Sequence, residues 1–529
     1  MQLRLTKFSG IAPKQTDLNL ESSFAVIAEN VNLERGTIQA WNQPSKISDN
    51  TGESIYVEDC CVITGDCDAR FAKTGIDCDN ILAATGVSET PVFTTVCPPA
   101  WEPLGFPCDM SAPSVVAPPA KDGLPEGNFS LELRAYYYTV SNRMGWESQP
   151  SVPSEWIRTN TLAEVSVTGF DIPNNATEIH IYRAQSPLDF DGELEIDDSA
   201  IFLHVGSIPV NQTVFRDNMK VAGSACLTEQ FDSPPSDLRE LCSWREGRLA
   251  GLTGNHFIMT ERSAPHAWNR KFLVGFYDKP IALQCTERTA YVLTDGRPAS
   301  LELRGDCAEG ESPIVVHEIP TPLPIVSRRS AATHMGAVVY ASRHGLVAIY
   351  QNRAVVITSS FYTEEQWAQL LPHTMVGAVC DGVYYGVTKN TMIRFDLPDE
   401  IFADPGPTAL TTLSLRPYAM HTAENGRLYM SLSNGTYEWN TGEERMTYRW
   451  RGKMHDTKGK VRMSAFNLRT SGNVKVTHYV DTSEIQETEA GNKHVRLPVG
   501  FAGEDWQVQF EGTAEIKEYT LATSIRELS

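Results

Sequence analysis

The stretch MGAVVYASRHGLVAIY, residues 335–350, consists of a short apolar run, a polar turn and a second apolar run. Short runs rich in Val, Ala, Ile and Tyr on either side of a turn favour a β-hairpin over a helix. The same pattern recurs in four other stretches: EGRLAGLTGNHFIMT (246–260), ERTAYVLTDGRPASLEL (287–303), DGVYYGVTKNTMIRFDL (381–397) and NGRLYMSLSNGTYEW (425–439). The chain is therefore predicted to be strand-rich and built from repeated hairpins.

The hairpins recur at a regular interval. Their anchor residues are Gly247, Thr289, Gly336, Gly382 and Gly426, which are separated by 42, 47, 46 and 44 residues. A hairpin repeat of about 45 residues is typical of β-propeller blades, which bury their faces against neighbouring blades. A β-sandwich whose hairpins are evenly spaced by coincidence is the alternative.

A sixth hairpin and an insertion precede the repeat. Residues 78–95 have the same hairpin pattern and are predicted to form another blade, contributed by the N-terminal part. The segment between contains alternating runs at 131–154 and 176–184, after a Pro-rich linker at 112–127. Alternation with period two predicts half-buried strands, and their spacing predicts an inserted fibronectin-III-like β-sandwich.

The predicted fold class is all-β: a β-propeller with an inserted fibronectin-III-like β-sandwich and a strand-rich C-terminal region. The predicted domains are 1–110, contributing to platform and propeller; 111–225, the sandwich; 226–447, the blades; and 448–529, completing the platform. The clearest helix candidate is TEEQWAQLL, 363–371, with an N-capping Thr, two acids in its first turn and a Pro just beyond its end.

Charge is distributed unevenly. The net charge is −21, which argues against tight binding to nucleic acid, because phosphate contacts need clustered Lys and Arg. Residues 45–126 contain 13 acidic and 4 basic side chains, and residues 185–240 contain 11 and 3. Residues 451–529 contain 11 of each sign. The acidity therefore belongs to two segments.

Motifs for catalysis are missing from the sequence. It has no GxSxG elbow, P-loop or HExxH motif, so a non-enzymatic protein without a cofactor or metal is predicted. The pairs Asp66 with Asp68 and Asp77 with Asp79 lack the ligand spacing of a calcium loop and are interpreted as solvated turns. His266 in RSAPHAW is interpreted as a packed loop histidine.

The eleven cysteines include no CxxC pair, so a zinc knuckle is not expected. Most of them are predicted to be buried or semi-buried free thiols, with disulfides formed after assembly and metal binding as the alternatives. The sequence has neither a signal-peptide core nor an apolar run of about 20 residues. A soluble protein made in the cytoplasm is therefore expected.

Several sequence motifs, which follow one another along the chain, resemble one family: the tail nozzle, tail hub or tail tubular proteins of short-tailed bacteriophages (podoviruses). The similar stretches are FSGIAPKQTDLNLESSFAVIAENVNLERGTIQAWNQP (8–44), LGFPCDMSAP (104–113), RSAPHAW (262–268), RSAATHMGAVVYASRHGLVAI (329–349), TEEQWAQLLP (363–372), HVRLPVGFAGEDWQVQFEG (494–512) and AEIKEYTLATSIREL (514–528). The resemblance runs nearly from end to end, and the order of the motifs is more specific than any one of them. The segment 60–79 is less similar to the family.

The resemblance implies a virion structural protein of the phage tail, made in the host bacterial cytoplasm. It implies a homo-oligomeric ring, a hexamer, that contacts head-to-tail connector (portal-adaptor) proteins, tail fibres or spikes, and the host outer membrane. Double-stranded DNA would pass through the ring without specific binding during viral genome ejection. No cofactor is implied.

A DNA conduit gains from acidic walls, because they repel phosphates and keep the DNA sliding. The candidate channel-lining or rim residues are Asp59, Asp66, Asp68, Asp77, Asp79, Asp189, Asp191, Glu193, Glu195, Asp197 and Asp198. The alternative role for these acids is to keep the unassembled subunit soluble. Two other functions stay open from sequence: a β-propeller that binds a receptor or glycan, and a depolymerase with paired carboxylates.

Overall fold

The computed structural model describes residues 1–59, 61–74, 81–107, 109–118, 131–187, 201–305 and 313–528. Within them lie 46 strands, one short α-helix and four 3₁₀ helices. The chain divides into two compact units. Unit 1 comprises Met1–Ala69, Phe276–Arg304 and Ile314–Ser529; unit 2 comprises Arg70–Gly275 and Gly305–Pro313.

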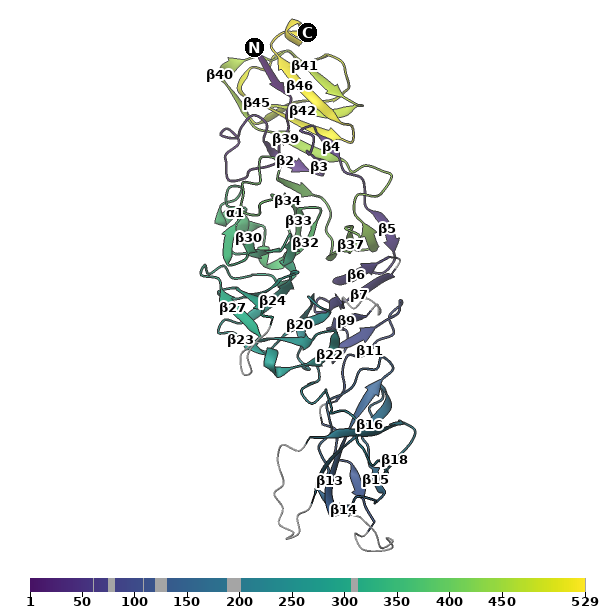
Figure 1. The fold of residues 1–529 in the computed structure, drawn as a ribbon. Coiled ribbons are helices and arrows are strands. Elements are labelled where there is room, and N and C mark those ends of the chain that lie inside the picture. The colour runs from purple at the N-terminus through teal and green to yellow at the C-terminus, as the bar shows by residue number, and fades with distance from the viewer. Residues whose placement is uncertain are drawn as a thin grey trace. The chain divides into compact units, whose positions relative to one another are not determined.

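Unit 1 contains successive antiparallel sheets in which four strands follow one another in chain order (Figure 1). Their strands are β24 (Pro280–Cys285), β25 (Thr289–Thr294), β26 (Ala299–Leu303) and β27 (Ile314–Glu318); β28 (Ala332–His334), β29 (Ala337–Ser342), β30 (Gly345–Tyr350) and β31 (Arg353–Val356); β32 (Val376–Cys380), β33 (Val383–Val387), β34 (Met392–Asp396) and β35 (Leu410–Leu413). The first strands of neighbouring sheets contact each other, β24 with β28 and β28 with β32. This is the arrangement of propeller blades.

The last blade-like sheet of unit 1 combines three strands from residues 419–438 with one strand from the N-terminal part. Its strands are β36 (Ala419–Thr422), β37 (Leu428–Leu432), β38 (Gly435–Glu438) and, from the N-terminal part, β5 (Ser45–Ser48). Tyr437 of β38 pairs with Lys46 of β5. The hairpin of β6 (Ser54–Glu58) and β7 (Cys61–Gly65) then packs Val57 against Ala419. The N-terminal segment therefore completes this sheet, as a closing strand does in a propeller.

Tight turns explain the regular repeat. Gly247, Gly336, Gly382 and Gly426 all have positive φ, between 67° and 82°. At the first three, the preceding residue also has positive φ. Two successive residues of this kind form the type I′ turn, whose twist matches that of the flanking strands. The repeated Gly is therefore the second turn residue before the second strand of each blade.

Unit 1 also contains a β domain made from both termini. One sheet contains β1 (Gln2–Leu5), β46 (Ile516–Ala522), β41 (Ala465–Thr470) and β44 (Val495–Arg496). The other contains, in order, β2 (Ala25–Glu29), β39 (Tyr448–Gly452), β45 (Gly503–Gly512), β42 (Val474–Val480) and β43 (Ser483–Ala490). Strand β40 (His455–Val461) also pairs with β45. Beyond β2 this sheet continues through β35 into the blade β32–β35. Phe8, Trp450, Phe510 and Tyr519 fill the core between them. Residues 448–528 with the pieces supplied by residues 1–40 form what is called here the C-terminal β domain.

Helical structure is scarce, as predicted. The expected helix is present as α1 (Glu364–Gln369), and Thr363 caps it in a full capping box with Gln366. Trp367 of this helix is fully buried and donates to the carbonyl of Ser342 at 2.7 Å. The remaining helices and short pairs are η1 (Arg270–Phe272), η2 (Arg328–Ser330), η3 (Pro372–Thr374), η4 (Ile525–Leu528), β3 (Val31–Asn32) and β4 (Gln39–Ala40).

Unit 2 contains two further blade-like sheets. Their strands are β8 (Arg70–Lys73), β9 (Leu82–Thr85), β10 (Val92–Thr94) and β11 (Glu102–Pro103); and β19 (Arg239–Trp244), β20 (Arg248–Thr253), β21 (His256–Glu261) and β22 (Ala264–Trp268), with β23 (Val274–Gly275) beside β21. The predicted upstream hairpin is present as β9 and β10. The first strands, β8 and β19, contact each other, and Arg70 of β8 pairs with the buried Glu240 of β19 at 3.2 Å.

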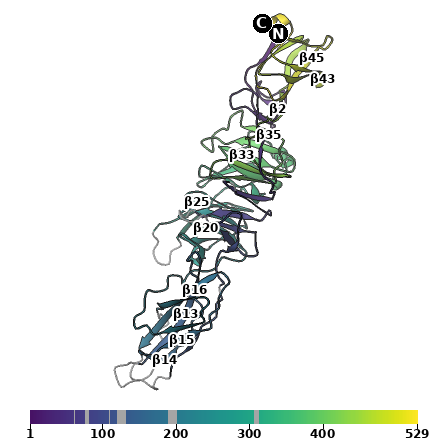
Figure 2. The same ribbon diagram turned by 90° about the vertical axis from the view of Figure 1, so that its right-hand side faces the viewer.

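The rest of unit 2 contains the predicted inserted sandwich, whose strands β13, β14, β15 and β16 are labelled in Figure 2. It has a three-stranded sheet of β12 (Ser114–Val116), β15 (Val165–Thr168) and β18 (Val214–Asp217) and a four-stranded sheet of β14 (Ile157–Asn160), β13 (Leu131–Asn142), β16 (Ala176–Pro187) and β17 (Leu203–Pro209). Tyr136 and Tyr138 lie in its core with Val165. The all-β fold with repeated blades, an inserted sandwich and a strand-rich C-terminal region is therefore confirmed.

Candidate functional site

The acidic candidates that the structure describes do not form one cluster. Asp59 is exposed at the turn between β6 and β7, where its φ is 49°. Asp66 and Asp68 are exposed at the other end of the same hairpin, after β7. The two ends of the hairpin are separated by the length of a five-residue strand, which is roughly 17 Å. The remaining candidates, Asp77, Asp79, Asp189, Asp191, Glu193, Glu195, Asp197 and Asp198, lie outside the described residues.

One of these acids already has a cationic partner. Arg328 of η2 forms an ion pair with Asp68, and its guanidinium also donates to the carbonyl of Cys67 at 3.1 Å. The Asp68 side chain is 66 % exposed, so water screens the pair and its contribution to stability is small. Of the described candidates, Asp59 and Asp66 have no ion-pair partner in the described part of the chain.

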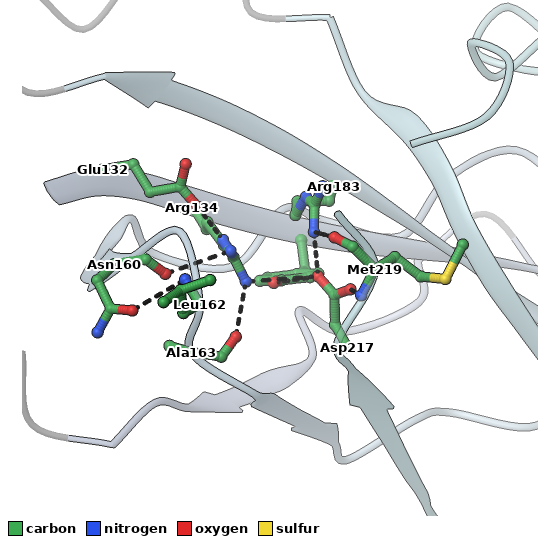
Figure 3. Close-up of polar contacts among 9 residues, drawn as sticks. Glu132, Arg134, Asn160, Leu162, Ala163, Arg183, Asp217 and Met219 are labelled. Atoms are coloured by element: carbon green, nitrogen blue, oxygen red, sulfur yellow. Dashed lines mark hydrogen bonds and ion pairs between the residues drawn. The ribbon is translucent and has the colours of Figure 1, made fainter. Parts of the chain in front are cut away.

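A different charged cluster, unpredicted from sequence, lies inside the sandwich (Figure 3). Asp217 at the end of β18 is fully buried. Its Oδ2 accepts from the Tyr136 hydroxyl and from Arg183 Nη1, each at 2.7 Å, and its Oδ1 accepts from the backbone N–H of Met219 at 3.0 Å. Arg134 Nη1 lies 3.8 Å from the same carboxylate. One carboxylate therefore holds strands β13, β16 and β18 together.

Arg134 extends this network along β13. Its Nε donates to Glu132 at 2.5 Å, and its Nη atoms donate to the carbonyls of Ala163 and Asn160 at 3.3 and 3.4 Å. Two arginines and two carboxylates make the network neutral, which offsets much of the desolvation cost of burying them. Desolvation and the Asp217 charge raise the pKa of Tyr136, so its hydroxyl stays a donor. Because nearly every polar group is satisfied internally, the network is structural.

Two buried histidines also have structural roles. His266 lies on β22, not in a loop, and its ring stacks on Trp146 with the centroids 5.1 Å apart. Burial lowers the pKa of His266 to about 4. His478 is fully buried in the C-terminal β domain, 2.7 Å from the Tyr519 hydroxyl, and burial lowers its pKa to about 3. Neutral imidazoles in such packing do not form an acid–base pair for catalysis.

The described cysteines are of two kinds, thiols and disulfide-bonded residues. Cys226 and Cys380 are buried thiols, and burial raises the pKa of Cys380 to about 11. Cys61 and Cys97 are instead disulfide-bonded, which corrects the thiol prediction at these two positions. Among the described residues, no group of three or more His, Cys, Asp or Glu could hold a metal ion. No helix in the described ranges is long and apolar enough to cross a membrane.

One pocket lies within unit 2, at the junction of the sandwich and the blade β8–β11. It measures about 780 Å³. Its lining includes Trp101, Glu102, Phe106, Ile172, Asn174 and Pro234. The surroundings fix several of these side chains: Trp101 stacks on Phe71 at 6.4 Å, and Glu102 pairs with Arg143 at 2.8 Å. An aromatic wall with a few amides can take a small, largely apolar ligand.

Comparison with known proteins finds no family. No protein-family model matches the chain, and no curated protein matches it. A solved extracellular domain of the putative one-component system BT4673 from B. thetaiotaomicron is 10 % identical, with 70 % of this chain and 46 % of that chain covered and a TM-score of 0.25. The chain thus spans about half the length of that protein.

Two other solved proteins have similarly low scores. PorZ, a bacterial surface component of the type-IX secretion system of Porphyromonas gingivalis, is 11 % identical, with 82 % and 66 % of the two chains covered and a TM-score of 0.27. Virginiamycin B lyase from Staphylococcus aureus is 11 % identical, with 61 % and 96 % covered and a TM-score of 0.23. At these scores none of the three informs the function of this chain.

Proposed function

We propose that this chain is a structural subunit of a phage tail nozzle and forms part of the channel through which the genome is ejected. One observation carries the proposal: the two stretches that resemble the ends of that family, residues 8–44 and 494–528, fold into the same domain. Phe8 packs edge-on against Phe510 with the ring centroids 6.3 Å apart, and Ile38 exchanges backbone hydrogen bonds with Ile516. The motifs at the two ends of the chain are therefore parts of one module.

The modular β structure and the charge support the same function. Stacked blades and sandwiches are rigid because each sheet is covered by its neighbours. A ring of six copies would carry six times the charge of −21, a strongly acidic assembly that does not grip DNA. The subunits would bind a head-to-tail connector and tail fibres, as the resemblance implies.

Imaging of the intact protein tests the proposed function. The full chain, mixed with its connector ring, is examined by negative-stain electron microscopy. We expect rings with six-fold symmetry and a central hole. Monodisperse monomers that ignore the connector would overturn the proposal.

The acidic lining is tested separately by charge reversal. Asp59 and Asp66 are replaced by Lys in the virion, with Asp399→Lys and Glu400→Lys, exposed acids outside the two acidic segments, as the matched control. If Asp59 and Asp66 face the lumen, DNA ejection slows while assembly is unchanged, because added cations bind phosphates. Equal ejection rates for both variants would assign these acids to solubility.

The second candidate function is binding of a receptor or glycan, and the pocket at Trp101 is the observation that favours it. An indole face and amides such as that of Asn174 suit a sugar ring. The measurement is calorimetric titration of host polysaccharide into the wild type and into Trp101→Ala. Saturable binding that the substitution removes would support this function, and absence of heat in the wild type would exclude it at this pocket.

A further inference from the structure

The pocket of about 780 Å³ in unit 2 is built by the fold itself. Its wall comes from residues within 90–107, 172–175 and 233–234. Hydrogen bonds tie these segments together: Asn175 Nδ2 donates to the carbonyl of Gly105 at 3.2 Å, and the Ser233 hydroxyl donates to the carbonyl of the next residue, Phe106. The pocket is therefore formed before any ligand arrives, as ligand sites usually are.

Rigid rings make up much of the wall. Five of the fourteen lining residues are prolines, and Trp101 and Phe106 are aromatic. The pyrrolidine ring fixes φ, so the proline wall has little freedom to lose when a ligand binds. The Trp101 indole stacks on Phe71 with the ring centroids 6.4 Å apart, which holds the indole in place. The pocket therefore offers a preorganised surface for a ligand with apolar rings.

The single charged lining residue, Glu102, is already neutralised. Its two carboxylate oxygens accept from Arg143 Nε at 2.9 and 3.1 Å, and Arg143 Nη2 lies 2.8 Å from one of them. A two-point contact of this kind is the strong form of an ion pair with arginine. A charged ligand would find no opposite charge free in this wall, so the pocket favours a neutral ligand.

Several hydrogen-bond acceptors of the wall are used within the chain. The carbonyls of Pro91 and Pro173 each accept a backbone hydrogen bond at 3.0 Å. Those of Gly105 and Phe106 accept from the side chains of the facing segments. The N–H or O–H groups of a ligand would therefore meet few free acceptors, and a donor that is buried without a partner weakens binding.

Two donors of the wall remain available. The Trp101 indole N–H and the exposed Asn174 amide form no hydrogen bond with the described residues. An indole can only donate, and the amide offers two donors beside its one oxygen. This balance suits a ligand with carbonyl oxygens and few donors. A sugar matches it less well, because each hydroxyl brings a donor with its oxygen.

We propose that this pocket docks an extended, proline-containing segment of another tail protein. Proline has no N–H, so a proline-rich segment brings carbonyl oxygens and apolar rings but few donors. In the polyproline II conformation its backbone makes no internal hydrogen bonds and leaves the carbonyls free. Such segments bind aromatic-lined grooves at a small entropic cost, because their conformation is already formed.

The two parts of this inference have different supports. The chemistry of the ligand, which is neutral, apolar and rich in carbonyls, rests on the pocket alone. The source of the ligand rests on the proposed function, because a structural tail subunit acts by holding other tail proteins. The pocket would then be an attachment point for one of them on unit 2.

Calorimetric titration of the full-length chain with end-capped decaproline tests the ligand class. We expect saturable binding to the wild type. Trp101→Phe keeps an aromatic ring without the N–H, and Asn174→Asp replaces donors by acceptors, so each should weaken binding by about tenfold. The matched control is Trp156→Phe, at a half-buried tryptophan of the same unit outside the pocket, which should leave binding unchanged. A Gly-Ser peptide of the same length should not bind.

The outcomes separate this inference from the proposed function. No binding of decaproline to the wild type, or equal affinity of the wild type and both pocket variants, would overturn the inference. Binding of host polysaccharide at the pocket in place of decaproline would also overturn it. Six-fold rings without decaproline binding would leave the proposed function standing and remove the inference. Decaproline binding without rings would support the ligand class and overturn the tail protein as its source.

Discussion

The sandwich contains a buried network of charged side chains, whereas the charged side chains of strands β40 and β43 in the C-terminal β domain are exposed. In the sandwich, Asp217 is fully buried and bonded to Tyr136 and Arg183. In the C-terminal β domain, Lys458 and Glu484 are exposed. Buried, satisfied charges hold the strands of the sandwich together, while exposed charges stay in contact with water and contribute little to folding. The same residue types therefore serve the fold in one region and remain solvated in the other.

The largest effect is expected from Asp217→Ala. Removing this carboxylate leaves Arg183 and Arg134 buried without it, and breaking a buried pair costs about 3–5 kcal/mol. Urea unfolding measured by a sandwich-specific tyrosine signal gives the free energy. The matched control is Glu164→Gln, which removes the exposed ion pair between Glu164 and Arg216. Arg216 is the neighbour of Asp217 on β18. This substitution should lower the free energy of unfolding by less than about 1 kcal/mol. Equal losses in the two variants would contradict a structural network.

A smaller effect is expected from acid. The pKa of His266 is about 4 when folded, below its usual 6.5, so the unfolded chain binds a proton first as pH falls. Stability present above pH 6.5 is therefore lost toward pH 4, by about 2 kcal/mol at pH 5 for this residue. His266→Gln should flatten the stability profile of unit 2 between pH 7 and 5, whatever its effect at pH 7. An unchanged slope would contradict this assignment.

The smallest effect on folding is expected at the charged edges. Lys458→Glu with Lys460→Glu changes exposed side chains that have no ion-pair partner among the described residues, so the free energy of unfolding of the unassembled subunit should change by less than about 0.5 kcal/mol. Thermal unfolding under conditions that prevent assembly measures it. A loss of several kcal/mol would mean that these lysines serve the fold, as Asp217 does, and the comparison would fail.

Sequence patterns predicted the local structure well. Apolar runs on either side of a turn, repeated about every 45 residues, predicted the hairpins, and alternation predicted the core strands of the sandwich, including Tyr136 and Tyr138. Pairings between distant segments were not predicted, such as β5 with β38 or β1 with β46. Hydrophobic alternation reports which face of a strand is buried, but it does not report which distant strand lies beside it.

The charged clusters were missed for a related reason. Net charge singled out the two acidic segments, yet residues 451–529 contain 11 side chains of each sign, so the acidic strand β43 is hidden in the sum. Glu487 and Glu489 at a spacing of two were the available signal, since such a spacing places both on one face of an extended strand. Glu132 and Arg134 have the same spacing and are buried, so the spacing alone does not separate an edge from a core network.

The most direct test of the central claim is a cryo-electron microscopy map of the assembled tail at side-chain resolution. The account predicts six copies of this chain around a central channel. A map in which the chain is a peripheral monomer or trimer, away from the channel, would contradict the account.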